Sequence, residues 1–503
     1  MRLLMFLLPC LLLVGSEPQP VTVPPPTGIE TLAALQSQLS NHVAAPRFSG
    51  ALWGVKISSL RTGKTLFETG AEKLMSPGSN CKLFPAAAAL VRLGVDYQIR
   101  TPLRSSAPVD QNGVLQGDLI VCGRGDPSWI QHEGAGDFWT VFAPFVSTLQ
   151  KAGVKVIHGD VVADATWLRC PPQGASWTAD DMNEGFGAEI SAISVLDNEV
   201  LLRVSPAAAA GQSCQLEFLS PLTGLSLENH TRTIAPEGER HIVVQRLPGS
   251  SRVQVYGELP RGGRAETTEV PVPRPAQWFA VSLVEALRRA GITVEGKPRS
   301  VVWPDTPVDT HVTLGIVASL PLRAMVKNLM KNSQNLETDL IFAHLGELCR
   351  NDSTPDWMRS DELAVTALEE FLREFKLRPD EVRFDEGSGL SRNDLATPAA
   401  FVRLLEFMNS RPEGAAFLDS LPVAGVDGSL RKRFHGTPAQ GKAQAKTGTL
   451  RYANGLTGFV TTAAQERLAF SLILNRFVPA AGHKSTEELD AILNWLAGYQ
   501  AKD

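Results

Sequence analysis

Apolar residues along this chain follow two different spacings. In some stretches they recur every three or four residues, which predicts amphipathic helices, and in others they alternate with polar residues, which predicts strands. Alternation predicts a β-hairpin over 49–70 that turns at Thr62-Gly63, and three consecutive antiparallel strands over 445–475. The helical spacing covers residues 28–44, 82–94, 137–152, 276–290, 318–349, 360–376, 397–409 and 488–499.

Between about residue 105 and residue 305 the chain changes character. Short apolar runs there are separated by Gly and Pro, which is typical of strands joined by turns. A chain of 503 residues is too long for a single hydrophobic core, so we expect two or three domains. The simplest architecture is an α/β domain that is built from the two ends of the chain and interrupted by a β-rich insertion.

The N-terminus has the features of a secretory signal peptide. A short positive start is followed by an apolar run and by small residues that end at Ser16. The run of about a dozen apolar residues is too short to cross a hydrocarbon layer of about 30 Å. Pro9, and the apolar residues that continue past Cys10, disfavour a lipid-modified cysteine. We therefore expect a signal peptide over 1–16.

The compartment follows from this signal. A Pro-rich leader is expected over 17–27, and no later stretch is long and apolar enough to span a membrane. The sequence therefore predicts an exported protein, periplasmic or secreted, without a transmembrane anchor after signal cleavage. Five cysteines remain after cleavage, and an odd number implies at least one free thiol or an intermolecular bridge.

Composition excludes several classes of protein. Hydrophobic residues make up 43% and charged residues 20%, as in an ordinary folded chain. The net charge of −5 gives no basic face for nucleic acid, so no nucleic-acid partner is expected. The nine histidines include no His-Glu-x-x-His pattern, so we expect no metal site and no cofactor.

Candidate chemistry begins at Ser79 and Lys82. Residues three apart on a helix share a face, so the Lys82 amine can reach the Ser79 hydroxyl. A hydroxyl becomes a good nucleophile only when a neighbouring base takes its proton, and a helix N-terminus disfavours the ammonium form of such a lysine. Ser429 and Lys432 have the same spacing, so this motif is weak when it is taken alone.

Two further motifs follow along the chain, and their order supports the first motif as a catalytic one. Ser333-Gln334-Asn335 lies where a predicted helix breaks and restarts, and Lys446-Thr447-Gly448 begins a strand. Ser391-Arg392-Asn393 repeats the Ser-x-Asn pattern, but Lys-Thr-Gly occurs once. Only 13 residues separate Lys432, the end of the Ser429 motif, from Lys446, and no Ser-x-Asn fits between them, which favours Ser79. Ser-x-x-Lys, Ser-x-Asn and Lys-Thr-Gly in this order are typical of serine penicillin-recognising enzymes.

Longer segments resemble one family, the D-alanyl-D-alanine carboxypeptidase/endopeptidases of the penicillin-binding protein 4 type (peptidase family S13). The resemblance implies an α/β fold in which a transpeptidase/β-lactamase-like domain, an antiparallel sheet flanked by helices, is split by a β-rich two-domain insertion. It implies a catalytic domain over 28–104 and 306–503, domain II over 105–200 and 272–305, and domain III over 201–271. The matching segments are residues 75–90, 123–129, 159–167, 191–200, 331–340, 386–394, 421–434 and 445–450.

The resemblance also implies a role for each motif residue. Ser79 attacks the carbonyl of the penultimate D-Ala, Lys82 is the general base, and Ser333 relays a proton to the leaving amine. Asn335 holds the substrate amide and Lys446 binds the terminal carboxylate. The remaining substrate-binding residues of the last motif are Thr447, Gly448 and Thr449, with the backbone N–H groups of Ser79 and Thr449 as the oxyanion hole.

Two outlying pairs are implied to contact the side chain of the stem peptide. These are Asp181 with Phe186, where an acid beside an aromatic suits the amino end of a diaminopimelate, and Leu390 with Arg392. The implied partners are peptidoglycan stem peptides, with β-lactam antibiotics as covalent inhibitors.

Three residues depart from the family pattern. They are Gln334 and Glu386, both where Asp is common, and Pro85, which removes an N–H early in the catalytic helix. Cys81, inside the first motif, is expected to be a small buried residue.

Two other readings stay open. A serine β-lactamase or related esterase of the same fold is the nearest alternative, and it would differ by rapid release of the acyl group. A non-catalytic wall-binding module is the second, although all three polar motifs are intact.

Overall fold

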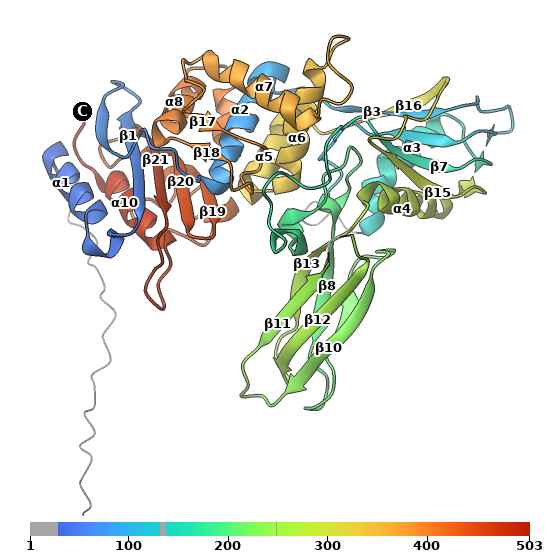
Figure 1. Cartoon of the computed structure of the whole chain (residues 1–503), viewed down its shortest axis with the longest axis horizontal. Helices are drawn as coiled ribbons and strands as arrows, with labels where there is room; N and C mark the ends of the chain where they lie inside the picture. The colour runs from blue at the N-terminus through green and yellow to red at the C-terminus, as the bar shows by residue number, and fades with distance from the viewer. Residues whose placement is uncertain (1–28, 131–136, 248, 503) are drawn as a thin grey trace, which may run out of the picture.

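The computed structural model describes residues 29–130, 137–247 and 249–502. The expected signal peptide and Pro-rich leader lie outside the described residues. The molecule is elongated, with a narrow strand-rich lobe that projects from the junction of two larger parts (Figure 1).

The two ends of the chain meet in one five-stranded antiparallel sheet, in the order β19-β20-β21-β1-β2. The first strand of the chain pairs along its whole length with the last, from Leu52 opposite Asn475 to Ser59 opposite Leu468. The predicted hairpin and the predicted three-stranded end of the chain are therefore confirmed. The strands are β1 (Leu52–Ser59), β2 (Thr65–Thr69), β19 (Ala443–Leu450), β20 (Ala453–Thr461) and β21 (Arg467–Asn475).

Helices cover both faces of this sheet. Leu35 of α1 and Leu493 of α10 belong to the hydrophobic core of one face. Phe401 of α8 and Phe84 of α2 belong to the core of the other face, and both rings are fully buried. The helices of this part are α1 (Leu32–Val43), α2 (Leu83–Leu93), α5 (Leu322–Asn332), α6 (Asn335–Cys349), α7 (Ser360–Arg373), α8 (Pro398–Asn409), α9 (Gly414–Ser420) and α10 (Thr486–Gly498).

A second five-stranded sheet has the order β15-β7-β5-β3-β16. Its inner face packs with α3 and α4 in a core that includes Phe145 and Phe279. β3 and β16 pair with each other, so this sheet extends beyond the boundaries expected at 104 and 306. The elements are β3 (Arg100–Ser105), β5 (Leu119–Cys122), β7 (Val161–Ala165), β15 (Pro298–Val302), β16 (Val312–Ala318), α3 (Ala143–Lys151) and α4 (Pro275–Arg289).

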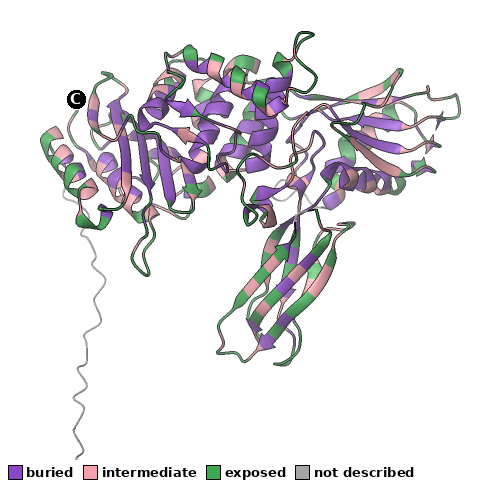
Figure 2. Cartoon of the chain, in the orientation of Figure 1, coloured by how far each residue is buried: buried purple, intermediate pink, exposed green. Residues whose placement is uncertain are grey.

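The projecting lobe consists of two three-stranded sheets, β13-β8-β9 and β10-β12-β11. Buried and exposed residues alternate along its strands, as a thin two-sheet packing requires (Figure 2). The division of the chain into three domains stays a prediction. The strands of the lobe are β8 (Glu199–Ser205), β9 (Gln215–Phe218), β10 (Ser226–Ile234), β11 (His241–Arg246), β12 (Arg252–Pro260) and β13 (Glu266–Pro271).

Short strands complete the described structure. They form a three-stranded sheet, β14-β6-β4, and a two-stranded sheet, β17-β18. Their bounds are β4 (Val114–Leu115), β6 (Val156–Ile157), β14 (Thr293–Val294), β17 (Val382–Arg383) and β18 (Leu395–Ala396).

Pro85 does not disturb the catalytic helix. A 3-10 turn, η2 (Gly78–Lys82), precedes α2, and Pro85 is the third residue of α2. The first turn of a helix has no internal partner for its N–H groups, so a proline there costs no helical hydrogen bond.

The five described cysteines are all unpaired, and Cys81 is buried as expected. Across residues 29–130, 137–247 and 249–502, no helix has the length and apolar character that crossing a membrane requires.

Candidate active site

Ser79 and Lys82 lie in η2, at the point where the chain enters α2. The turn brings the Lys82 Nζ within 3.0 Å of the Ser79 Oγ, as the three-residue spacing predicts. Ser79 is half-buried, whereas Lys82 is fully buried. The Lys82 amine also donates to the Asn335 Oδ1 at 2.6 Å and to the Ser388 carbonyl at 2.5 Å.

Burial governs the charge of Lys82. Removal from water disfavours the ammonium and lowers the pKa of Lys82 to about 8, although the carboxyl groups of Asp339 and Glu386 oppose the shift. A lysine with a pKa close to the working pH holds a substantial neutral fraction, which a general base requires. Lys82 therefore combines the contact and the acidity expected of the base for Ser79.

Glycines allow the nucleophile turn to lie directly against the sheet. A Cβ on Gly448 would stand 2.0 Å from the Pro77 carbonyl oxygen, and one on Gly78 would stand 2.8 Å from the Thr449 nitrogen. Gly78 also has a φ of +54°, which favours glycine. Gly448 thus has a packing reason to be glycine, beside the substrate-binding role that the resemblance implies.

The Ser-x-Asn motif lies at a break between two helices. α5 ends at Asn332, Ser333 caps it with a left-handed φ of +61°, and α6 starts at Asn335. This break turns the Ser333 hydroxyl towards Lys446, whose Nζ donates to the Ser333 Oγ at 2.6 Å. A non-glycine residue in this backbone region is uncommon and is often found at functional sites.

Lys446 is the second fully buried lysine of the site. It extends from β19 and donates to the Thr447 carbonyl as well as to Ser333. Burial, followed by repulsion from Lys82, lowers the pKa of Lys446 well below its usual range. An anion bound beside Lys446 would offset both effects.

A cavity of about 790 Å³ opens over these groups. Four motif residues, Ser79, Ser333, Asn335 and Thr449, line it, while both lysines lie beneath its surface. All four outlying residues line the same cavity: Asp181, Phe186, Leu390 and Arg392. Thr447 and Gly448 are not part of its lining among the described residues. The cavity thus brings together residues that are up to 370 positions apart, from Ser79 to Thr449.

Asp181 is not a solvated loop carboxylate. It is 6% exposed and accepts hydrogen bonds from Arg392 at 2.7 and 3.2 Å and from the Thr178 N–H and hydroxyl, both at 2.8 Å. Phe186 is 46% exposed, and its carbonyl accepts a hydrogen bond from the Asn335 amide. The outlying pairs are therefore connected both to each other and to the Ser-x-Asn motif.

Sequence reasoning missed several residues that line this cavity. Arg451 and Tyr452 lie in the tight turn between β19 and β20, and Arg451 pairs with Asp180 at 3.9 Å. Their position directly after the Lys-Thr-Gly strand was the available signal. The others are Thr178, Asp180, Glu184, Gly389 and Leu450, to which the sequence analysis gave no role.

Ser429, the first residue of the competing Ser-x-x-Lys match, has a supporting position. Its Oγ lies 2.9 Å from the Thr447 Oγ1. The 3-10 turn η7 (Gly428–Leu430) presents it to the exposed side of β19. Ser429 is therefore placed to orient the Thr447 hydroxyl and not to act as a nucleophile.

We expect Ser429→Ala to lower the rate constant for acylation by a penicillin about two- to tenfold, because one neutral hydrogen bond contributes about 0.5–1.5 kcal/mol. Ser429→Thr keeps the hydroxyl and should restore most of the rate. A loss above about a thousandfold in Ser429→Ala would instead mark Ser429 as the nucleophile.

Comparison with known proteins decides the family. The model of the D-Ala-D-Ala carboxypeptidase 3 (S13) family matches residues 35–497. The chain belongs to this family. The resemblance drawn from the motifs is thereby confirmed, and the chain is a serine D-Ala-D-Ala carboxypeptidase of the penicillin-binding class.

Individual relatives agree with this S13 membership. The chain is 30% identical over 483 residues to a D-alanyl-D-alanine carboxypeptidase of Actinomadura sp. (strain R39), covering 94% of this chain and 86% of that protein. It is 26% identical over 434 residues to a D-alanyl-D-alanine carboxypeptidase of Haemophilus influenzae, covering 85% and 86%.

A solved structure confirms the expected fold class. The crystal structure of penicillin binding protein 4 from Haemophilus influenzae matches with a TM-score of 0.74 at 25% identity, covering 91% of this chain and 97% of that one.

Proposed function

We propose that this S13 enzyme removes the terminal D-Ala from peptidoglycan stem peptides through an acyl-enzyme on Ser79. One observation carries the proposal: the Ser79 Oγ lies 3.0 Å from the Nζ of a buried lysine, at the base of a cavity that Ser333, Asn335 and Thr449 also line. Endopeptidase cleavage of cross-links uses the same step on a longer leaving group. β-Lactams, whose amide is presented in the same way, are proposed to acylate Ser79.

In the first step, neutral Lys82 takes the Ser79 proton as Oγ attacks the carbonyl of the penultimate D-Ala. The resulting oxyanion accepts hydrogen bonds from the N–H groups of Ser79 and Thr449. β19 is an edge strand of the sheet, and the first part of its outer edge pairs with residues 422–424 through Ala443 and Ala445. The backbone groups of Thr447 and Thr449 that face away from β20 can therefore pair with an extended substrate.

In the second step, the tetrahedral intermediate collapses, the C–N bond breaks and the amine of the terminal D-Ala leaves. Ser333 donates its proton to that amine and regains one through Lys446 or Lys82. Water then attacks the ester, with Lys82 as base, and releases the shortened peptide and Ser79.

Lys446 couples substrate binding to this chemistry. The terminal carboxylate of the substrate favours the ammonium form of Lys446. The two lysines repel each other, and the negative charge of a carboxylate beside Lys446 offsets that repulsion. A bound carboxylate therefore lets Lys446 be charged without adding net charge beside the Lys82 base.

The compartment is also a proposal. We infer that the protein works outside the cytoplasm, where its peptidoglycan substrate lies, and that residues 1–16 are the export signal. We also propose that the chain divides into the catalytic domain and domains II and III, with the boundaries expected from the sequence.

Release of D-Ala from a synthetic peptide that ends in D-Ala-D-Ala tests the proposed activity, with the L-Ala-L-Ala peptide as control. We expect release from the first peptide only. No release from either, together with turnover of penicillin within seconds, would favour a β-lactamase. No release and no acylation would favour a wall-binding module.

Arg392 gives a prediction about substrate choice. Arg392→Ala removes both guanidinium hydrogen bonds from Asp181 and leaves that buried carboxylate with Thr178 alone. We expect D-Ala release from a peptide with a diaminopimelate side chain to fall at least about tenfold, because a buried charge that loses its partner is costly.

The control for this prediction is a small penicillin, which lacks the diaminopimelate side chain. Its acylation rate should change less than about threefold in Arg392→Ala. Arg451→Ala, on the exposed rim of the same cavity, should leave the preference between stem peptides unchanged. Equal losses for the peptide and the penicillin in Arg392→Ala would contradict a role in substrate choice.

A further inference from the structure

Three carboxyl groups lie together behind Lys82. Asp339 is on α6, one turn after Asn335, and therefore shares its face. Glu386 and Asp394 belong to the segment that connects β17 with β18. Their exposed fractions are only 3%, 3% and 1%, and they form no ion pair within 4 Å with any described lysine or arginine. We refer to Asp339, Glu386 and Asp394 as the carboxyl cluster.

The carboxyl cluster fixes the loop that contacts the base. Glu386 Oε1 accepts the N–H groups of Gly389 at 2.7 Å, Leu390 at 2.8 Å and Ser391 at 3.1 Å. Its Oε2 accepts the Ser388 hydroxyl. Asp339 Oδ1 accepts the N–H groups of Gly387 and Ser388, both at 2.9 Å. Two carboxyl groups thus hold every peptide unit around the Ser388 carbonyl, which is the acceptor for Lys82.

The hydrogen bonds also assign the protons of the carboxyl cluster. Asp339 Oδ2 and Asp394 Oδ2 are buried, and no N–H or hydroxyl group of the described residues donates to them. A buried carboxyl oxygen that receives no hydrogen bond favours the neutral acid, because burial disfavours an unsolvated charge, so we assign the protons to Asp339 and Asp394. Glu386, which accepts from backbone and side chains on both oxygens, is the ionised member.

The acidities agree with this assignment. Burial and then the charge of Glu386 raise the pKa values of Asp339 and Asp394. Burial alone would raise the pKa of Glu386, but hydrogen bonds from Asp339, Ser388, Asp394 and Ser391 lower it below its usual value.

We propose that Glu386 is a positioning residue for the Lys82 base: as the single ionised member of the carboxyl cluster, it holds the Ser388 carbonyl at Lys82 and places one negative charge behind the amine. Asp339 and Asp394 act as neutral hydrogen-bond donors to it. The inference rests on the proposed function, since it concerns the base for Ser79.

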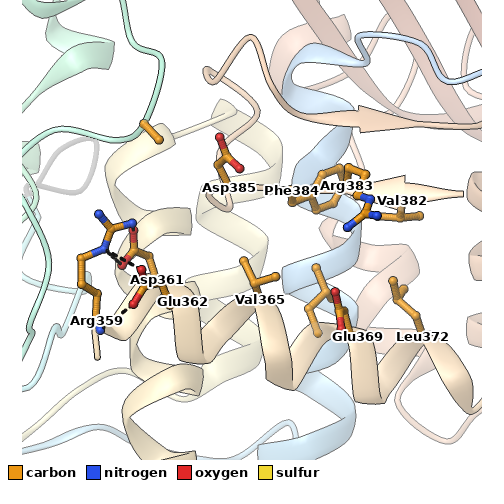
Figure 3. Close-up of a pocket in the computed structure, with 12 residues that line it drawn as sticks. Arg359, Asp361, Glu362, Val365, Glu369, Leu372, Val382, Arg383, Phe384 and Asp385 are labelled. Carbon is orange, nitrogen blue, oxygen red and sulfur yellow. Dashed lines mark hydrogen bonds and ion pairs between the residues drawn. The ribbon is translucent and has the colours of Figure 1, made fainter. Parts of the chain in front are cut away.

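All charged and titratable groups around Lys82 bear on this proposal. They are Cys81 on the same turn, the carboxyl cluster on α6 and the 386–394 loop, and Lys446 on β19. The neighbouring Asp385 lines a separate cavity of about 450 Å³ between α7 and residues 382–385 (Figure 3). Its Oδ2 accepts from the Asn393 amide, and it supplies a matched control on the same segment.

The first test replaces both aspartic acids by asparagine. In D339N/D394N each amide NH₂ takes the place of the acid O–H that donates to Glu386, and each Oδ1 still accepts its backbone N–H. We expect acylation by a fluorescent penicillin to stay within about threefold of wild type, with an unchanged pH profile. A loss of more than tenfold in the folded D339N/D394N protein would overturn the proposal, because it would show that an aspartate charge is required.

The second test adds E386Q to D339N/D394N, so that no carboxyl group can take over the charge. The side-chain amide of E386Q then faces the NH₂ groups of D339N and D394N. We expect acylation to fall about 10²-fold, as for a base displaced by about 1 Å. The acid limb of the pH profile should move to lower pH, because loss of the negative charge favours neutral Lys82. Asp385→Asn should change neither quantity.

The outcomes separate the two proposals. If wild type is not acylated at all, the proposed function fails. If wild type is acylated but D339N/E386Q/D394N loses rate with no shift of the acid limb, or loses less than threefold, the inference about Glu386 fails alone. If the triple variant does not fold, as its melting temperature would show, the D339N/D394N result still decides.

Discussion

Ser79→Ala is expected to abolish acylation by penicillin and to lower D-Ala release at least about 10⁴-fold. Removal of the nucleophile from a serine hydrolase leaves only the contribution of the oxyanion hole and substrate binding. The hydroxyl is half-buried and contacts Lys82, so its loss leaves a small cavity and should not prevent folding. Steady-state release of D-Ala and gel fluorescence of labelled protein measure the two effects.

Ser429→Ala is the matched control, because Ser429 begins the other Ser-x-x-Lys match of the chain and lies close to the same strand. It should keep at least about a tenth of the wild-type rate. Undiminished labelling of Ser79→Ala, or loss of labelling in Ser429→Ala, would contradict the assignment of the nucleophile.

Lys82→Ala is expected to lower acylation about 10³- to 10⁴-fold, since base and nucleophile act as a unit. The wild-type profile should also carry the signature of this lysine. Below pH 8 the amine is mostly protonated, so the rate of acylation should fall about tenfold for each further pH unit, and above pH 8 it should level off.

Lys82→Arg separates charge from basicity. A guanidinium keeps a positive charge near Asn335 and Ser388 but does not lose its proton in this pH range. We expect it to be as inactive as Lys82→Ala. Substantial acylation by Lys82→Arg, or a flat wild-type profile between pH 6 and 9, would show that another group takes the Ser79 proton.

Local sequence signals predicted the parts of the site that depend on neighbours along the chain. The three-residue spacing predicted the contact of Ser79 with Lys82, and the interrupted helical pattern over 318–349 predicted the break at which Ser333 lies. The antiparallel end of the chain was evident from its alternation, so the position of Lys446 on a strand followed.

Contacts between distant segments could not be read in this way. The pairing of Asp181 with Arg392 joins residues 211 positions apart, and that of Lys82 with the Ser388 carbonyl spans 306. Such contacts depend on how the chain folds, which no local pattern encodes. Glu386 stood out only as a departure from a family pattern, and its neighbours Asp339 and Asp394 not at all.

Domain boundaries were uncertain for a similar reason. β3 directly follows a segment of the catalytic part and β16 directly precedes one, without a turn-rich linker, yet the two strands pair in the second sheet. Strand pairing decides sheet membership, and composition changes only some residues later.

Mass spectrometry of the penicillin-treated wild-type protein tests the central claim most directly. The account predicts one penicilloyl group per chain, stable to denaturation, on the peptide that contains Ser79 and Lys82, with the ester on Ser79. An adduct on any other residue, or rapid turnover of penicillin without an adduct, would contradict it.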